Sequence, residues 1–494
     1  NTAEKMAKGG IYDQLGGGFH RYAVDAIWLV PHFEKMLYDN AQLIRIYLHL
    51  YQIFSSSKFK VQSSKSVEAE FFRRIAVETL EYVKREMLDA SGGFYSSQDA
   101  DSEGEEGKFF VWTRGEIEAV LGAEDVAEFC ALYDVTNEGN FEGHNIPNIR
   151  GGVTGDLGLT GNSELKTDNW RENIDSSQSS VSSFQPVSRI NAMKEKLFTE
   201  REKRVKPFRD EKILTAWNGL MLAAFAEAAA VFDSAEYLEV AKRNADFLLE
   251  NLMQKPDGKT STTPSAEADA APPFQRGSLR LLRTWKAGRA KLNGYIEDYA
   301  NLADGLIELY QVSGEAKYLT AAKSLADSMI TEFWDDENGG FYFTSNDHEE
   351  LIVRNKDFFD NATPSGNSVA SDVLLKLAKF YCEEKYERFA ASVLRLATSQ
   401  IKRFPSGFGR TLSAAESYLA DVKEVAIIGP KGSELEREVW AEYRPFKILA
   451  VGEGNDVPLL ADRQQIDAKP TAFVCENFVC QRPVTTEKEL SELL

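Results

Sequence analysis

The sequence is poor in cysteine and histidine and has no long apolar run. Its four cysteines, Cys130, Cys382, Cys475 and Cys480, are too few for a disulfide framework, and the last two have neither redox-motif nor zinc-knuckle spacing. A reducing, cytoplasmic compartment is therefore expected. No segment approaches the ~20 continuous apolar residues that span a bilayer, so we predict no membrane span.

Positive charge is also scarce. The chain has 57 Lys and Arg against 77 Asp and Glu, which gives a net charge of −20 at pH 7. Nucleic acids and anionic membranes repel such a surface, so neither is predicted as a partner. No phosphate loop, dinucleotide fingerprint, HExxH zinc motif or Ser-His-Asp arrangement appears in a convincing context. We predict no metal and no cofactor.

What the chain does contain is a repeat. Four segments start with polar and aromatic residues and continue as apolar helices rich in small residues, beginning near 32, 214, 297 and 364. Amphipathic helices follow them, at about 67–88, 235–253, 316–333 and 386–403. This pattern predicts a ring of helical hairpins, an (α/α)6 toroid, whose polar helix starts meet at one mouth. A plain helical bundle is the alternative, but it does not account for the polar starts.

Shorter features surround the repeat. Gly17-Gly18-Phe19, Gly92-Gly93-Phe94 and Gly339-Gly340-Phe341 predict small hairpins at the rim, with 109–112 as the return strand of the second. Two stretches of small and polar residues are expected to be surface insertions, at 155–188 and 255–275. Buried strands alternate with helices after about residue 420. We therefore predict a toroid over 1–420 and a small α/β region over 421–494.

The densest polar cluster lies between Gly16 and Asn40 and holds two of the five histidines. Histidine moves protons near neutral pH, so His20 and His32 are predicted as catalytic acid or base. The alternative is structural: His32 caps a helix and His20 packs against aromatic rings. The ligand contacts predicted in this cluster are Arg21, Trp28, Glu34, Tyr38 and Asp39.

Further polar groups lie in an acidic turn and at the predicted helix starts. Asp99 and Asp298 are predicted as a catalytic carboxylate pair, which would flank a glycosidic bond at a separation of about 5–9.5 Å. A solvated turn and helix caps are the alternatives. Aromatic faces beside carboxylates and amides suit sugars. The remaining predicted ligand contacts are Gln98, Asp101, Asp210, Trp217, Asn218, Glu297, Tyr299, Arg354, Lys356, Asp360 and Asn367.

Several long motifs resemble those of the spermatogenesis-associated protein 20 family, namely 31–39, 97–102, 214–219 and 362–367. Members of that family carry a thioredoxin-like domain ahead of this region. Because this chain starts at Asn1, we expect it to begin inside a longer protein with such a domain. The resemblance implies a six-hairpin, glycosidase-like toroid similar to N-acylglucosamine 2-epimerase and cellobiose epimerase. It implies no established reaction.

Two functions follow as hypotheses. The first is binding or processing of a sugar-like ligand, either by epimerisation or isomerisation, with Arg21 or Arg354 stabilising an enolate, or by glycoside hydrolysis. The second is a non-catalytic module that binds a ligand or client for the thioredoxin-like domain. The sequence favours the first and leaves open whether the chain is an enzyme.

Overall fold

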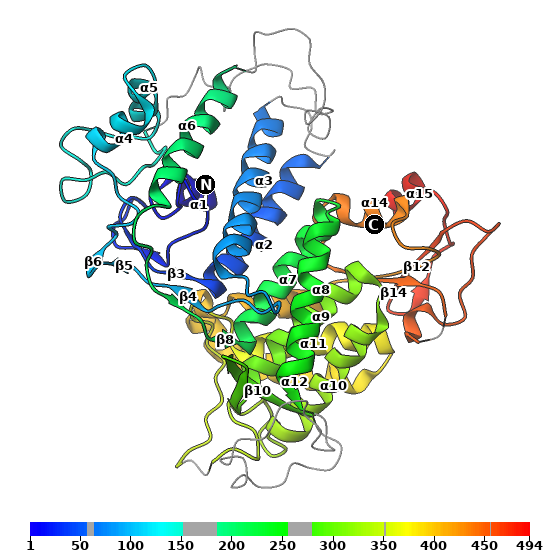
Figure 1. The fold of residues 1–494 in the computed structure, drawn as a ribbon. Helices are drawn as coiled ribbons and strands as arrows, with labels where there is room; N and C mark the ends of the chain where they lie inside the picture. Colours follow the sequence, from blue (N-terminus) through cyan, green and yellow to red (C-terminus); the bar gives the residue numbers. More distant parts are fainter. Residues whose placement is uncertain (57–63, 152–184, 255–278, 350–351, 455) are drawn as a thin grey trace. The chain divides into compact units, whose positions relative to one another are not determined.

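A computed structural model describes residues 1–56, 64–151, 185–254, 279–349, 352–454 and 456–494 (Figure 1). The chain divides into two compact units. Unit 1 comprises Asn1–Met36, His49–Glu86 and Ser97–Asp210, and unit 2 comprises Leu37–Leu48, Met87–Ser96 and Glu211–Leu494. The insertion expected at 255–275 lies outside the described residues, as does that at 155–188 apart from 185–188. The predicted division at residue 420 stays a prediction.

Helices dominate both units. In chain order they are α1 (Thr2–Lys8), α2 (Leu37–Ser55), α3 (Ser64–Tyr82), the π-helical turn η2 (Val83–Met87), α4 (Arg114–Leu121), α5 (Val126–Leu132), α6 (Gln185–Arg201), α7 (Thr215–Val231), α8 (Ala235–Asn251), α9 (Ile296–Ser313), α10 (Ala316–Phe333), α11 (Gly366–Tyr381), α12 (Glu384–Arg403), the 3₁₀ turn η4 (Pro405–Gly407), α13 (Gly409–Leu419), α14 (Glu434–Ala441), the 3₁₀ turn η5 (Pro458–Leu460) and α15 (Glu487–Leu493). No helix among the described residues is long and apolar enough to cross a bilayer.

Outside the C-terminal region, the described strands have two residues each except β10 and β11, which are longer. They are β1 (Tyr22–Ala23), β2 (Pro31–His32), β3 (Lys35–Met36), β4 (Ser97–Gln98), β5 (Asp101–Ser102), β6 (Glu105–Glu106), β7 (Arg209–Asp210), β8 (Ile213–Leu214), β9 (Met253–Gln254), β10 (Arg280–Lys286), β11 (Arg289–Asn293), β12 (Lys423–Ile428), β13 (Lys447–Gly452), β14 (Thr471–Glu476) and β15 (Val479–Cys480). The C-terminal strands form one sheet in the order β13-β12-β14-β15, with β12 parallel to β13 and antiparallel to β14.

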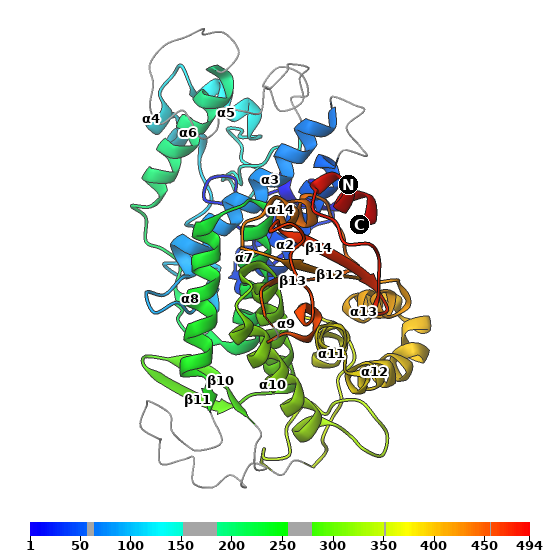
Figure 2. The ribbon, with the colours of Figure 1, turned by 90° about the vertical axis from the view of Figure 1, so that its right-hand side faces the viewer.

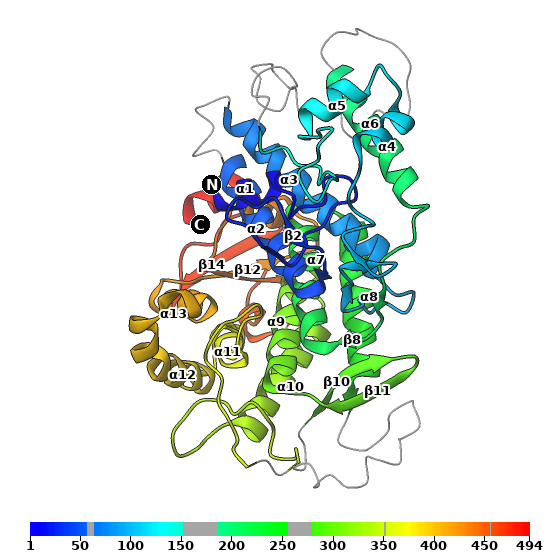
Figure 3. The same cartoon turned by 90° about the vertical axis from the view of Figure 1, so that its left-hand side faces the viewer.

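Unit 2 is built from helical pairs. Helices α7, α9, α11 and α13 pack side by side as inner helices, and α8, α10 and α12 each cover one of them from outside (Figures 2 and 3). The inner helices α7 and α9 are buried along nearly their whole length, whereas α8, α10 and α12 each keep one exposed face. The expected fold class, mainly α with helical hairpins of the (α/α)6 type and a small C-terminal α/β region, is confirmed.

Glycines let the two most buried helices approach each other closely. A Cβ atom on Gly219 of α7 would lie 2.5 Å from the carbonyl of Asn301 of α9, and one on Gly305 would lie 2.5 Å from the carbonyl of Gly219. Any side chain at either position would push the two backbones apart. The backbones of α7 and α9 are therefore in close contact at these two glycines.

The three predicted glycine-rich hairpins share one set of hydrogen bonds. In each, an aspartate N–H donates to the second glycine carbonyl, and the first glycine N–H donates back to the aspartate carbonyl; the aspartates are Asp13, Asp89 and Asp335. Each carboxylate also accepts from the backbone amide two residues later. The return strand expected at 109–112 is wrong, because Trp112 pairs with Asn145 and Phe94 pairs with Leu88.

Two asparagines fasten hairpins of unit 2 to inner helices. Asn218 of α7 accepts from the amide of Phe94 at 2.8 Å and donates to its carbonyl at 3.0 Å. Asn367 of α11 does the same with Phe341, at 2.8 Å in both directions. Both side chains are buried, so the two amides replace a strand partner for the phenylalanine backbone.

We expect Asn218→Ala and Asn367→Ala each to lower the free energy of unfolding by about 2–4 kcal/mol, because each leaves a buried N–H and C=O unsatisfied. Urea unfolding followed by circular dichroism would measure this. Asn251→Ala is the matched control, since Asn251 donates to a carbonyl of its own helix and is part-buried. Equal losses in all three variants would contradict the proposed fastening role.

Candidate functional site

His20 lies in the aromatic core of unit 1. Its side chain is 2% exposed, a ring nitrogen bonds the carbonyl of Phe33 at 2.8 Å, and the ring packs edge-on against Phe33 and Phe110. Burial, followed by the charge of Lys35, lowers the pKa of His20 to about 3, so the ring is neutral at pH 7. These contacts match the structural alternative, a histidine packed against aromatic rings. Its catalytic role stays a prediction.

His32 lies on a more open part of unit 1. Its Nδ1 is 2.7 Å from Oε1 of Glu106, and its Nε2 is 3.6 Å from Oε2 of Glu34. The same Glu34 oxygen accepts from Arg21 at 2.9 Å. The structure therefore brings together three predicted residues, His32, Glu34 and Arg21, with Glu106 added. The role of His32 as a catalytic acid or base stays a prediction.

One further predicted residue of unit 1 reaches this group, because Asp101 of β5 pairs with Glu106 of β6 through the backbone. Gln98 is buried, and its Oε1 accepts from the hydroxyl of Tyr82 at 3.2 Å. Asp99 is exposed, and its carboxylate accepts from the next backbone amide, as in a solvated turn. Trp28 has a positive φ of 65° in a loop, Asp101 is exposed on β5, and Asp210 lies on β7 beside β4.

Asp298 connects the starts of α9 and α7 in unit 2. It is fully buried, and it accepts from the amides of Ala216 and Tyr295 and from Arg283 at 2.9–3.1 Å. Burial raises the pKa of Asp298 to about 7. Glu297 also binds Arg283, at 2.8 Å. These contacts favour a cap for Asp298, and its predicted catalytic role stays a prediction.

Six further predicted residues of unit 2 also hold backbone in place. Lys356 bonds the carboxylate of Asp335 and the carbonyl of Gly339, so it secures the third hairpin. Asp360 accepts from the amides at the starts of α11 and α13. Tyr299 bonds β10, Arg354 bonds the carbonyl of Thr344, and Asn367 and Asn218 fasten the hairpins described above.

Tyr38 and Trp217 are brought together as predicted. Their rings meet edge to face, with centroids 4.7 Å apart, between the first turns of α2 and α7. Asp39 lies in the same first turn of α2. Tyr38 belongs to a polar face of α2 that continues at Gln42 and Arg45, at helical spacing.

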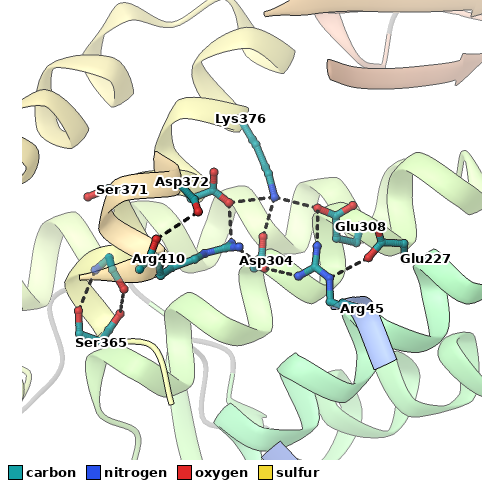
Figure 4. A network of polar contacts seen from close by, with 12 residues as sticks. Arg45, Glu227, Asp304, Glu308, Ser365, Ser371, Asp372, Lys376 and Arg410 are labelled. Carbon is teal, nitrogen blue, oxygen red and sulfur yellow. Dashed lines mark hydrogen bonds and ion pairs between the residues drawn. The ribbon is translucent and has the colours of Figure 1, made fainter. Parts of the chain in front are cut away.

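A network of charged side chains continues this polar face across the inner helices of unit 2 (Figure 4). Lys376 of α11 lies 2.8 Å from Asp304 and 2.8 Å from Glu308 of α9, and 3.1 Å from Asp372 of its own helix. Arg410 of α13 binds Asp304 at 3.0 Å and Asp372 at 2.6 Å. One amine and one guanidinium thus bridge three helices.

The network reaches α2 and α7 through Arg45. Its guanidinium is 2.8 Å from Glu227 of α7, 3.6 Å from Asp304 and 3.9 Å from Glu308. The cations hold the pKa of Asp304 far below its usual range although burial opposes this. Four carboxylates face three cations in this set, namely Glu227, Asp304, Glu308 and Asp372 against Arg45, Lys376 and Arg410.

Sequence reasoning missed this network. A signal was present, because Glu297, Asn301, Asp304, Glu308 and Gln311 follow one another at intervals of four, three, four and three in an otherwise apolar helix. Such spacing places all five side chains on one face of α9. The site prediction rests on the polar residues at each helix start and does not include the polar stripe beyond the first turn.

A cavity of about 100 Å³ opens beside the network, between α11, α12, α13 and the C-terminal sheet. It has room for several water molecules, and a small ligand inside it would contact its polar lining. Its polar lining includes Asp372, Lys376, Lys379, Glu387, Ser417 and Lys447, and its aromatic lining is Tyr418 and Phe446. No group of His, Cys, Asp and Glu within the described ranges is placed to hold a metal ion.

Lys447 differs from the other lysines of the cavity. Lys376 and Lys379 have carboxylate partners, whereas no ion pair is found for Lys447 among the described residues. Its amine lies 3.7 Å from the ring centre of Trp440, and burial lowers its pKa to about 8. Lys447 is therefore close to half-protonated just above neutral pH, which suits proton transfer.

Comparison with known proteins finds relatives that match the chain over its whole length. It is 32% identical to human spermatogenesis-associated protein 20 and 30% identical to the rat protein, over its whole length and 62% of theirs. The relation expected from the motifs is confirmed: the chain is a homologue of these proteins and spans about three fifths of their length. No family model matches the sequence.

Solved structures give more distant matches. Cellobiose 2-epimerase from Bacillus thermoamylovorans is 10% identical, with a TM-score of 0.39 over 78% of this chain and 66% of the other. A D-mannose isomerase is 15% identical, with a TM-score of 0.35 over 80% of this chain and 84% of the other.

We expect unit 1 to lose stability in acid through His20. Because its folded pKa of about 3 lies below the ordinary value of 6.5, the unfolded chain binds the proton first as pH falls. Stability should therefore fall below pH 6.5, by up to about 1.4 kcal/mol per pH unit from this group. His20→Phe, which cannot titrate, should have a flatter profile in urea unfolding from pH 7 to 4. An unchanged slope would contradict the burial of His20, and exposed His144→Phe is the control.

Asp304→Asn should lower the free energy of unfolding by about 3–5 kcal/mol at pH 7, because it leaves buried cations with too few carboxylates. The loss should shrink as pH falls below about 4, because the unfolded wild-type chain then binds a proton at Asp304 while the folded carboxylate resists protonation, so the stability that this carboxylate contributes declines. Asp246→Asn removes an exposed carboxylate paired with Lys317 and should cost under about 1 kcal/mol. Chemical unfolding at pH 7 and pH 3 measures both, and a similar loss in the two variants would argue against a stabilising network.

Proposed function

We propose that unit 2 binds a sugar-like, polyhydroxylated ligand in the cavity between α11, α13 and the C-terminal sheet. The observation that supports this is the polar stripe of the inner helices, which ends at that cavity with Asp372 and Lys376 in its lining. Carboxylates accept hydrogen bonds from hydroxyls, and ammonium groups donate to them. Tyr418 and Phe446 offer apolar surface for a sugar face.

Energetics favour a binding role over a purely structural one. Taking charged groups out of water costs several kcal/mol per ion, and apolar replacements of similar volume are often as stable. Helix α9 packs Asp304, Glu308 and Gln311 against its neighbours where apolar residues would fit an inner helix. We infer that these polar groups are retained because they hold Asp372 and Lys376 in position for a ligand.

Lys447 supports processing as well as binding. With a pKa of about 8 and no carboxylate partner among the described residues, its amine can remove a proton from carbon beside a sugar carbonyl and return one. This is the chemistry of epimerisation or isomerisation. Within unit 1, His32 with Glu34 and Glu106 is proposed separately as an acid–base group. Asp99 and Asp298 each stay proposed as catalytic carboxylates for glycoside hydrolysis.

The alternative is a non-catalytic module that binds a ligand or client for a thioredoxin-like domain. The activity and partners of the whole protein are proposals too, because the chain spans 62% of its relatives' length. Binding without turnover would favour this alternative. Deuterium incorporation from heavy water into the bound sugar would favour epimerisation.

We expect the purified chain to be stabilised by at least one member of a panel of aldoses, ketoses, uronates and disaccharides. The melting temperature should rise with sugar concentration, because a ligand that binds only the folded state stabilises it. Lys447→Met should abolish this rise and any deuterium incorporation. Differential scanning fluorimetry and proton NMR provide the two measurements.

Lys385→Met is the matched control, because Lys385 lies on α12 in exposed ion pairs with Asp327 and Glu383. It should leave the sugar-induced shift unchanged. No shift with any sugar, or the same shift in Lys447→Met and the wild type, would overturn the proposal for this cavity.

A further inference from the structure

The C-terminal sheet carries a disulfide that the cysteine spacing did not predict. Cys475 of β14 and Cys480 of β15 lie directly opposite each other and are bonded. The strand β15 is the edge of the sheet, and Phe478 and Val479 beside it are 49% and 74% exposed. The disulfide therefore closes an edge hairpin that other molecules can reach.

The two sulfur atoms differ in access. Cys475 is fully buried, whereas Cys480 is exposed. A thiolate from another molecule can therefore approach Sγ of Cys480 along the S–S axis, and Cys475 is the sulfur that leaves. Thiol–disulfide exchange is fastest when the leaving thiolate is stabilised.

Arg463 is placed to stabilise that leaving group. Its Nη2 lies 3.5 Å from Sγ of Cys475 and 3.3 Å from Sγ of Cys480. Its Nη1 donates to the carbonyls of Leu459 and Ala461, which fixes the guanidinium. No carboxylate pairs with Arg463 among the described residues, so its charge faces the sulfurs. A cation next to a cysteine favours the thiolate.

We propose that Cys475–Cys480 is a redox-active disulfide that accepts two electrons from a dithiol, and that Arg463 is its positioning cation. The electron donor is a protein dithiol or a small dithiol with access to the sheet edge. This site is separate from the proposed sugar cavity in its chemistry and does not depend on it.

The exchange balances in two steps. A donor thiolate attacks Sγ of Cys480, the Cys475–Cys480 bond breaks, and Cys475 leaves as a thiolate beside Arg463. The second donor thiol then loses its proton and attacks the mixed disulfide, which releases Cys480. The donor ends as a disulfide, both cysteines end as thiols, and the two protons come from the donor.

The hairpin closed by this disulfide also contacts α11. The side chain of Asn477 accepts from Lys379 at 3.0 Å, and the amide of Phe478 donates to Glu424 at 3.0 Å. Lys379 is itself 3.1 Å from Glu424, and Asn477 lines the cavity. The turn of this hairpin therefore forms part of the cavity wall.

The test equilibrates the folded full chain with mixtures of reduced and oxidised dithiothreitol or glutathione, traps thiols with iodoacetamide, and measures the 475–480 peptide by mass. We expect the pair to be reduced without denaturant, as labile disulfides are. Arg463→Gln should make reduction about tenfold less favourable, which is about 30 mV. Arg463→Lys, which keeps the charge, should remain near the wild type.

A second readout follows the reduced protein alone. Alkylation of Cys480 should be half-maximal below the ordinary thiol pKa of about 8.5, and Arg463→Gln should move it upward. Cys382→Ser, the control, should change neither result, since Cys382 is exposed and outside the disulfide. The proposal is overturned if the disulfide resists reduction until the chain unfolds, if Gln and Lys variants behave alike, or if Cys382→Ser abolishes the exchange.

Discussion

Neutralisation of charge between the inner helices is the constraint on which unit 2 depends. Asp304 and Glu308 of α9 face α11 and α2, and they are stable there because Lys376, Arg45 and Arg410 meet them at 2.8–3.9 Å. The ion pairs fix the rotation of each helix about its axis, since turning α9 by one residue would bury unpaired carboxylates. The close backbone contact between α7 and α9 at Gly219 adds a steric constraint to this electrostatic constraint.

The sequence predicted the helices well because their signal is local. The outer helix expected at 316–333 is α10, Ala316–Phe333, and its apolar positions face the inner layer as the 3.6-residue period requires. The strands of the C-terminal region were also found, since runs such as 447–451 are buried and flanked by turns. Periodicity and turn chemistry need no knowledge of distant contacts.

The candidate site was less predictable because polar residues at helix starts have two uses. Asn218, Asp298 and Asn367 lie where a ligand contact was expected, yet each satisfies backbone groups of a neighbouring segment. A helix start offers free N–H groups, so caps and ligand sites draw on the same residue types. Asp304 depends on Lys376 and Arg410, which lie 72 and 106 residues away along the chain, and no local sequence pattern identifies such partners.

The glycine-rich hairpins share one backbone hydrogen-bond pattern, and this pattern affects where the chain can vary in length. Asp89 is separated from its first hairpin glycine by two residues, whereas Asp335 is separated from its own by three, yet both turns close with the same backbone bonds. Each turn is thus closed by its own backbone hydrogen bonds and tolerates a change in length. Insertions and deletions in homologous chains should therefore occur between the aspartate and the first glycine of these turns, while the aspartate and the paired glycines keep their hydrogen bonds.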